Sequence, residues 1–216
     1  MLYLHAIAQL PAGKADAYLR AMHTHLLPEA QQAGLRLVGA WRSVPTTGRA
    51  DEVLALWELD GWEHYARLQR DGNPIECWAP PPDASPLARE GRVLIPSPRC
   101  PTLAQLLERG VRGQVLLHER ITPCSGQSQA YLKSSEEGWL PLAAERGYQW
   151  VGSYRVAIKG SHVFELWLLK DWEALARAMD TQAGNKAVQA WMESVKAYRA
   201  DWDDCLFTPA TFCPLG

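Results

Sequence analysis

Apolar residues in this chain follow two spacings, one typical of β-strands and one typical of helices. In the first hundred residues they predict the order strand, helix, strand, strand, helix, strand. The strands are expected at 2–10, 35–42, 53–59 and 92–95. The first helix should begin at Lys14, bend or restart at Pro28 and end at Gly34. The second should begin near Asp60, whose carboxylate suits an N-cap.

The remaining residues predict the same order. Strands are expected at 114–122, 148–156, 162–169 and near 205–208, with a turn across Lys159-Gly160. A helix is expected at 127–146, with an interruption at Pro141. A second helix should follow the capping residue Asp171, and a third is expected at 186–203. The segment 74–86 holds five prolines and is expected to be a loop. A short helix is expected within 100–112.

The two halves also match residue by residue. A shift of 113 positions places Leu4, His5 and Tyr18 on Leu117, His118 and Tyr131, and a shift of 110 places Trp57 on Trp167. We interpret this match as a duplicated domain of ordinary size, with one copy at 1–100 and the other at 112–214.

The order βαββαβ is that of the ferredoxin-like split βαβ unit. The fold class predicted is therefore α+β, with two tandem ferredoxin-like units whose antiparallel sheets form an α/β barrel. Such a unit leaves one sheet face without helices, and an open apolar face must be buried. Two units can bury these faces against each other and enclose a lumen that suits a small molecule.

Composition narrows the function classes. The net charge is −2 and no basic run is present, so no nucleic-acid partner is expected. No apolar stretch approaches the roughly 20 residues of a membrane span, and Met1 leads into a strand without the pattern of a signal peptide. The five cysteines lack CxxC or metal-site spacing. They predict thiols in a reducing compartment, and hence a cytoplasmic protein with no metal site.

The segments LPAGKADAYL, LLPEAQQAGLRLVGAWRS and VLALWELDGWEHYARL, with their second copies WLPLAAERGYQWVGSYRV and FELWLLKDWEALARA, resemble the NIPSNAP proteins of the dimeric α/β-barrel superfamily. The resemblance covers most of both halves. It implies a homodimer, and a fold shared by cofactor-free monooxygenases, haem enzymes, muconolactone isomerase and binding proteins, so it does not fix an activity. Ala6 stands where an arginine is expected in the first strand.

His5 and His118 are the candidate catalytic residues. They occupy matching mid-strand positions, and histidine titrates near neutrality, where it can serve as general acid or base. If the face with Leu2, Leu4 and Ala6 packs on the helices, both imidazoles point into the barrel. The alternative is that duplication preserved a buried structural histidine.

The candidate substrate-binding residues are mostly aromatic, and together they would form a flat pocket. They are Tyr3, Trp41, Trp57, Tyr154, Glu165 and Trp167. Arg42 and Arg155 could hold a carboxylate or an oxyanion. The alternatives are that the aromatic residues are core and the arginines belong to structural ion pairs. His23 and His25 diverge on a helix, so they predict no metal site.

Three functions stay open. The first is a cofactor-independent enzyme that carries out proton transfer or oxygenation on an aromatic or polyketide-like molecule. The second is a non-catalytic ligand-binding or scaffold protein whose tryptophans fill the lumen. The third is a haem-dependent enzyme with His5 or His118 as axial ligand.

Overall fold

The computed structural model describes residues 1–158, 162–182 and 184–216. These residues form two compact units. Unit 1 comprises Met1–Ile95 and Phe207–Gly216, and unit 2 comprises Pro96–Leu206.

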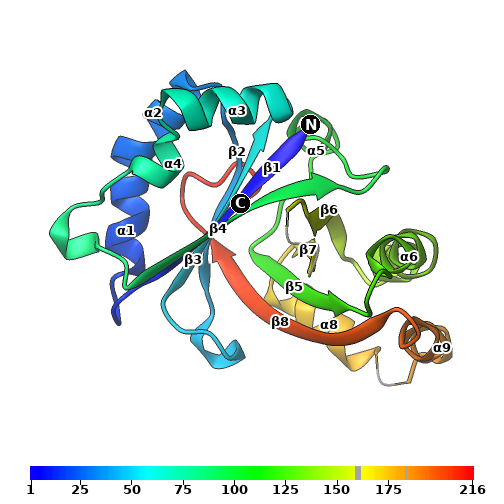
Figure 1. Cartoon of the computed structure of the whole chain (residues 1–216). Helices are drawn as coiled ribbons and strands as arrows, with labels where there is room; N and C mark the ends of the chain where they lie inside the picture. Colours follow the sequence, from blue (N-terminus) through cyan, green and yellow to red (C-terminus); the bar gives the residue numbers. More distant parts are fainter. Residues whose placement is uncertain (159–161, 183) are drawn as a thin grey trace. The chain divides into compact units, whose positions relative to one another are not determined.

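Unit 1 has the predicted order of strand, helix, two strands, helix and strand (Figure 1). Its elements are β1 (Leu2–Gln9), α1 (Ala15–Ala21), the π-helical turn η1 (Met22–Leu26), α2 (Leu27–Gln32), β2 (Arg36–Ser43), the 3-10 turn η2 (Pro45–Thr47), β3 (Glu52–Leu59), α3 (Trp62–Asp71), α4 (Pro74–Cys77), the 3-10 turn η3 (Pro82–Ala84) and β4 (Ala88–Pro96). Strand β1 pairs with β3 and β4, and β2 pairs with β3, all antiparallel.

Unit 2 has the same order, preceded by a short helix. Its elements are α5 (Leu103–Glu108), β5 (Val115–Pro123), α6 (Ser128–Ser134), the π-helical turn η4 (Ser135–Trp139), α7 (Leu140–Glu145), β6 (Gln149–Val156), β7 (Val163–Leu169), α8 (Trp172–Asp180), α9 (Lys186–Val195) and β8 (Arg199–Pro209). Strand β7 pairs antiparallel with β5 and β6.

Two strands belong partly to each unit. Strand β4 ends at Pro96, the first residue of unit 2, and β8 ends with Phe207–Pro209, which pair with β2 in unit 1. The hydrogen-bonded strand order closes on itself as β1-β3-β2-β8-β5-β7-β6-β4. The predicted fold class, α+β with antiparallel strands in an α/β-barrel order, is therefore confirmed.

The prolines of the first long helix in each unit act as predicted. A five-residue π-helical turn precedes α2, and Pro28 lies in the first turn of α2, where its missing N–H is not needed. Unit 2 repeats this arrangement with η4 and Pro141. Gly34 follows α2 with a φ of 81°, a conformation that favours glycine after a helix.

Three local predictions are wrong. Helix α9 ends at Val195, and the residues from Arg199 onward form β8, since pairing in a sheet overrides helical spacing. The segment 74–86 holds α4 and η3, because proline at a first helical position is already set for a helix. Gly61 rather than Asp60 precedes α3, and Asp60 instead pairs with Arg36 over 2.8 Å.

Asp171 is the N-cap of α8, as predicted, and accepts the backbone N–H of Ala174 at 2.7 Å. The predicted turn at Lys159-Gly160 lies outside the described residues. None of the helices in the described ranges combines the length and the apolarity needed to cross a bilayer.

Candidate functional site

The cross-strand register shows which side chains of unit 1 share a sheet face. Leu4 lies opposite Trp57, and Ala6 lies opposite Ala55. Directly opposed residues point to the same side of a sheet. This side faces the helices, since Tyr18 of α1 lines one cavity together with Ala6, Ala55 and Trp57.

The alternate residues of β1 point to the opposite face. Tyr3 lies opposite Glu58 and His5 lies opposite Leu56. Tyr3 donates a hydrogen bond from its hydroxyl to Glu58 Oε2 over 2.9 Å. Trp41 lies opposite Leu54, so it shares this face.

Unit 2 divides its side chains in the same way. His118 lies opposite Leu166, and its ring lies 5.4 Å from that of Phe164. Tyr154 lies opposite Phe164, so both share the face of His118. Trp167 lies on the helix face and packs edge-on against Trp139.

The residues predicted to form one aromatic pocket therefore lie in two groups, on opposite faces of the strands. Tyr3, Trp41 and Tyr154 lie on the faces that carry His5 and His118, whereas Trp57, Glu165 and Trp167 lie on the helix faces. The expectation that all six aromatic and acidic residues line one surface is wrong, because side chains of a strand alternate between faces. The register places His5 and His118 on the sheet faces opposite to those that face the helices.

The helix face of unit 1 holds a cavity of about 230 Å³. Its sheet wall is a row of small residues in register: Gly91 on β4, Ala6 on β1 and Ala55 on β3. The row continues to Ala40 on β2. A Cβ atom added to Gly91 would meet no atom within 4 Å, so the small side chains leave real space.

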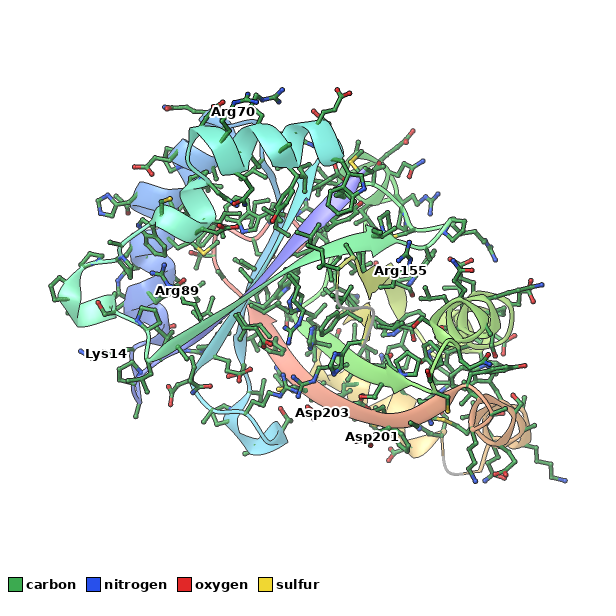
Figure 2. The ribbon with its side chains drawn as sticks, in the orientation of Figure 1. Lys14, Arg70, Arg89, Arg155, Asp201 and Asp203 are labelled. Carbon is green, nitrogen blue, oxygen red and sulfur yellow. The ribbon has the colours of Figure 1, made fainter. Side chains whose placement is uncertain are left out.

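Four polar or charged side chains border this cavity: Tyr18, Arg89, Glu76 and Glu90. Glu76 accepts hydrogen bonds from Gln69 and Asn73, and Glu90 pairs with Arg92. Burial raises the pKa of Tyr18, while the positive charge of Arg89 opposes that rise. Arg89 lies near α1 at the beginning of β4 (Figure 2) and donates a hydrogen bond to the carbonyl of Trp78 over 2.6 Å. The ring of Trp78 packs edge-on against Tyr18 at 5.2 Å. The cavity therefore combines an apolar body with a phenol and a cation, and its border also holds two carboxylates that are engaged by other side chains.

The matching row in unit 2 is polar. Glu119 on β5 lies opposite Glu165 on β7, and Glu165 lies opposite Ser153 on β6. Glu165 is fully buried and accepts hydrogen bonds from Tyr131 over 3.1 Å, from Ser135 over 2.6 Å and from Ser153 over 2.8 Å. Glu165 stands at the position that Ala55 occupies in unit 1.

Two facing carboxyl groups in this row have a raised pKa. Burial raises the pKa of Glu119 well above its usual value, and the charges of Asp204 and Glu165 add to the rise. Burial also raises the pKa of Glu165, but its three hydroxyl donors oppose that rise. Among the residues that the structure describes, Glu119 has no such set of hydroxyl donors, and only the indole of Trp167 and the charge of Arg199 oppose the rise of its pKa. Its Oε2 accepts a hydrogen bond from Trp167 over 2.6 Å.

The two candidate arginines lie on the helix faces, since Arg42 is opposite Val53 and Arg155 is opposite Val163. Arg42 pairs with Asp16 of α1 over 2.9 Å. It does not line the 230 Å³ cavity.

Sequence reasoning missed the residues that shape this cavity. From the sequence alone, Tyr18 and Arg89 have no role in a site, and Ala6 is noted only for the arginine that it replaces. Ala55 and Gly91 give no signal, because alanine and glycine carry no reactive group. A column-by-column comparison of the two halves would have found them, since Ala6 and Ala55 match Glu119 and Glu165.

The cavity does not fit a haem held by His5. That histidine lies on the other face of the sheet, so it cannot supply an axial ligand to a group bound here. Among the described residues, no group of three or more His, Cys, Asp or Glu side chains is arranged to hold a metal ion.

Comparison with solved structures agrees with this architecture. An anthrone oxidase-like protein matches with a TM-score of 0.71 and 12% identity over 97% of this chain and 91% of its own. A "putative monooxygenase" from Lactobacillus acidophilus NCFM matches with a TM-score of 0.61 and 9% identity over 96% and 94%. The chain has the dimeric α/β-barrel fold.

NIPSNAP proteins, the family that the sequence resembles, are also among the similar structures. A NIPSNAP domain protein from Burkholderia xenovorans is 19% identical over 46% of this chain and 98% of its own, with a TM-score of 0.42. No family model matches the sequence, and neither does any curated protein. At these identities the likeness concerns the fold.

Proposed function

We propose that unit 1 binds a small, flat and largely apolar molecule that carries an ionisable oxygen. The observation that carries this proposal is the cavity of about 230 Å³ beside the row of Gly91, Ala6 and Ala55. A dry cavity of about 150 Å³ holds one benzene ring, so this space suits a molecule of about two fused rings.

Tyr18 and Arg89 indicate the chemistry of the polar end. A raised pKa keeps the Tyr18 phenol protonated near neutral pH, where it can donate a hydrogen bond. The guanidinium of Arg89 favours an anionic oxygen, such as a phenolate, an enolate or a carboxylate. Both groups would stabilise the ionised form of an enolisable aromatic ligand.

The catalytic form of this proposal is cofactor-independent proton transfer or oxygenation of that ligand. Hydrogen bonds to a developing oxyanion are a common source of rate acceleration. A proton-transfer role for His5 or His118 is a separate proposal, because it requires a substrate on the opposite sheet face. The alternative is binding without turnover.

Binding of 2-naphthol, followed by its fluorescence, tests the proposal. Ala55→Glu places the carboxyl of unit 2 in the cavity and should abolish binding. Gly91→Val adds a smaller, uncharged side chain to the same cavity. It should weaken binding at least about tenfold, or about 1.4 kcal/mol. Saturable binding that is unaffected by both folded variants would show that the ligand lies elsewhere.

Naphthalene-2-carboxylate tests the polar end. Arg89→Gln should weaken its binding about tenfold and weaken that of naphthalene much less. Arg70→Gln is the matched control, since Arg70 is an exposed arginine of α3. Absorbance of bound 2-naphthol over time separates turnover from simple binding.

We also propose that the chain forms a homodimer. Exposed tryptophans support this, since Trp62 and Trp202 each keep 49% of their surface exposed. Light scattering should detect a species of twice 24.1 kDa. A single 24.1 kDa species at micromolar concentration would contradict the proposal.

A further inference from the structure

A second cavity of unit 1 has a different character. It has a volume of about 390 Å³ and lies beside α1, η1 and β2, where residues 208–212 close it. It shares no lining residue with the apolar cavity.

Basic side chains dominate its lining. Arg20, His23 and Arg42 face one acidic residue, Asp16. The Asp16 carboxylate pairs with Nη1 of Arg42 over 2.9 Å, with side-chain exposures of 60% and 47%. Exposed ion pairs of this kind are weak, so an anion from solution can compete with Asp16 for Arg42.

The cavity also has a flat wall and hydroxyl donors. The ring of His23 stacks on Phe212 at 4.6 Å with an interplanar angle of 4°. Thr208 and Thr211 lie on the same lining, and the Thr208 hydroxyl donates a hydrogen bond to the carbonyl of Arg42 over 3.5 Å. An aromatic group can pack beside such a wall while arginine and hydroxyl groups bind its charged end.

Unit 2 lacks this combination. At a shift of 113, Asp16, Arg20 and His23 correspond to Gln129, Lys133 and Glu136. An acid therefore stands in place of the histidine, and Arg155 lies in surroundings that differ from those of Arg42. The matching positions of unit 2 therefore do not repeat the set of side chains that lines the basic cavity.

We propose that this cavity binds a small aromatic phosphomonoester, with the phosphate at Arg20 and Arg42 and the ring beside His23 and Phe212. Guanidinium groups match the geometry of phosphate oxygens, and the Thr211 hydroxyl supplies a further donor. The volume exceeds the space that a phosphate ion alone requires, which leaves room for the organic group. The site is independent of the 2-naphthol site.

Calorimetric titration with phenyl phosphate at low salt tests this proposal, with phenol and inorganic phosphate as comparison probes. Phenyl phosphate should bind more tightly than either. Arg20→Gln and Arg42→Gln should each weaken binding at least about fivefold, whereas Arg70→Gln should leave it unchanged. Asp16→Asn should strengthen binding about threefold or more, because it removes the competing carboxylate.

The Asp16 variant gives the decisive result. A merely structural ion pair would make Asp16→Asn neutral or weakening, and either result would overturn the proposal. Absence of phenyl phosphate binding at about 10 mM would overturn it as well. Binding of 2-naphthol should be unchanged in Arg42→Gln, so failure here is distinguishable from failure of the first proposal.

Discussion

Tyr131 donates a hydrogen bond to Glu165 over 3.1 Å, while its counterpart Tyr18 borders an open cavity because Ala55 stands at the position of Glu165. Tyr131 thus belongs to a buried hydrogen-bond network, whereas Tyr18 lines a cavity. The two units share a framework but differ in the side chains that occupy it.

Removal of the Glu165 side chain should strongly destabilise the protein. Glu165→Ala leaves Tyr131, Ser135 and Ser153 without their shared acceptor, and unpaired buried hydroxyls are costly. We expect the free energy of unfolding in urea to fall by about 2–4 kcal/mol. Glu165→Gln keeps one acceptor oxygen and should lose less. Equal, small losses in both variants would contradict the assigned network.

Stability should depend on the protonation of Glu119. Its folded pKa lies well above the ordinary value of 4.5, so the folded state keeps a proton that the unfolded chain releases. The stability from this neutral carboxyl is fully present below about pH 4.5 and is lost as the pH rises through the folded pKa.

Urea unfolding at a series of pH values measures this effect. Glu119→Gln should flatten the decline above pH 4.5, since glutamine does not titrate. Glu193→Gln is the control, because Glu193 is an exposed glutamate of α9 with 73% of its side chain accessible. An unchanged slope in Glu119→Gln would mean that Glu119 is ionised in the folded protein.

The two matched tryptophans should both matter to stability. Trp57 and Trp167 are 0% and 1% exposed, and replacing a buried tryptophan with alanine costs about 3–5 kcal/mol. Trp167→Phe tests the indole separately, because it removes the donor to Glu119 while it retains an aromatic ring. Chemical denaturation that shows losses below about 1 kcal/mol for both alanine variants would contradict their role as core.

The matched histidines should not affect the apolar cavity. His5 lies on the opposite face of the sheet, so His5→Gln should leave the 2-naphthol dissociation constant within about twofold. His118→Gln should also leave the 2-naphthol dissociation constant within about twofold, because His118 lies in unit 2. If either residue transfers a proton, its variant should instead change the pH profile of turnover. A large loss of 2-naphthol affinity in a folded His5→Gln variant would contradict the face assignment.

The framework could be predicted from the sequence because its signals are local. Alternation along β1, the proline in each long helix and the glycine at Gly34 each set a backbone conformation through nearby residues. The length of β8 could not be predicted, since its residues form a strand through partners distant in sequence.

The candidate site was predicted only in part. Trp57, a candidate because of its aromatic ring, does line the cavity. His5, a candidate because imidazole can transfer protons, lies on the other face of the sheet. The decisive residues were Ala6, Ala55 and Gly91, whose importance lies in the atoms that they lack. A search of the sequence for reactive or aromatic side chains does not select such positions.

Strand β8 has a consequence for dissecting this protein. Because Phe207–Gly216 belongs to unit 1, a single cut near Pro96 would separate unit 1 from the segment that pairs with the edge of β2 at Trp41–Ser43. A fragment that ends at Ile95 would carry an unprotected strand edge and should tend to aggregate. To express unit 1 by itself, residues 207–216 would have to be joined to residues 1–95 through a new linker. We therefore expect that no single cut in the chain yields two units that both fold independently.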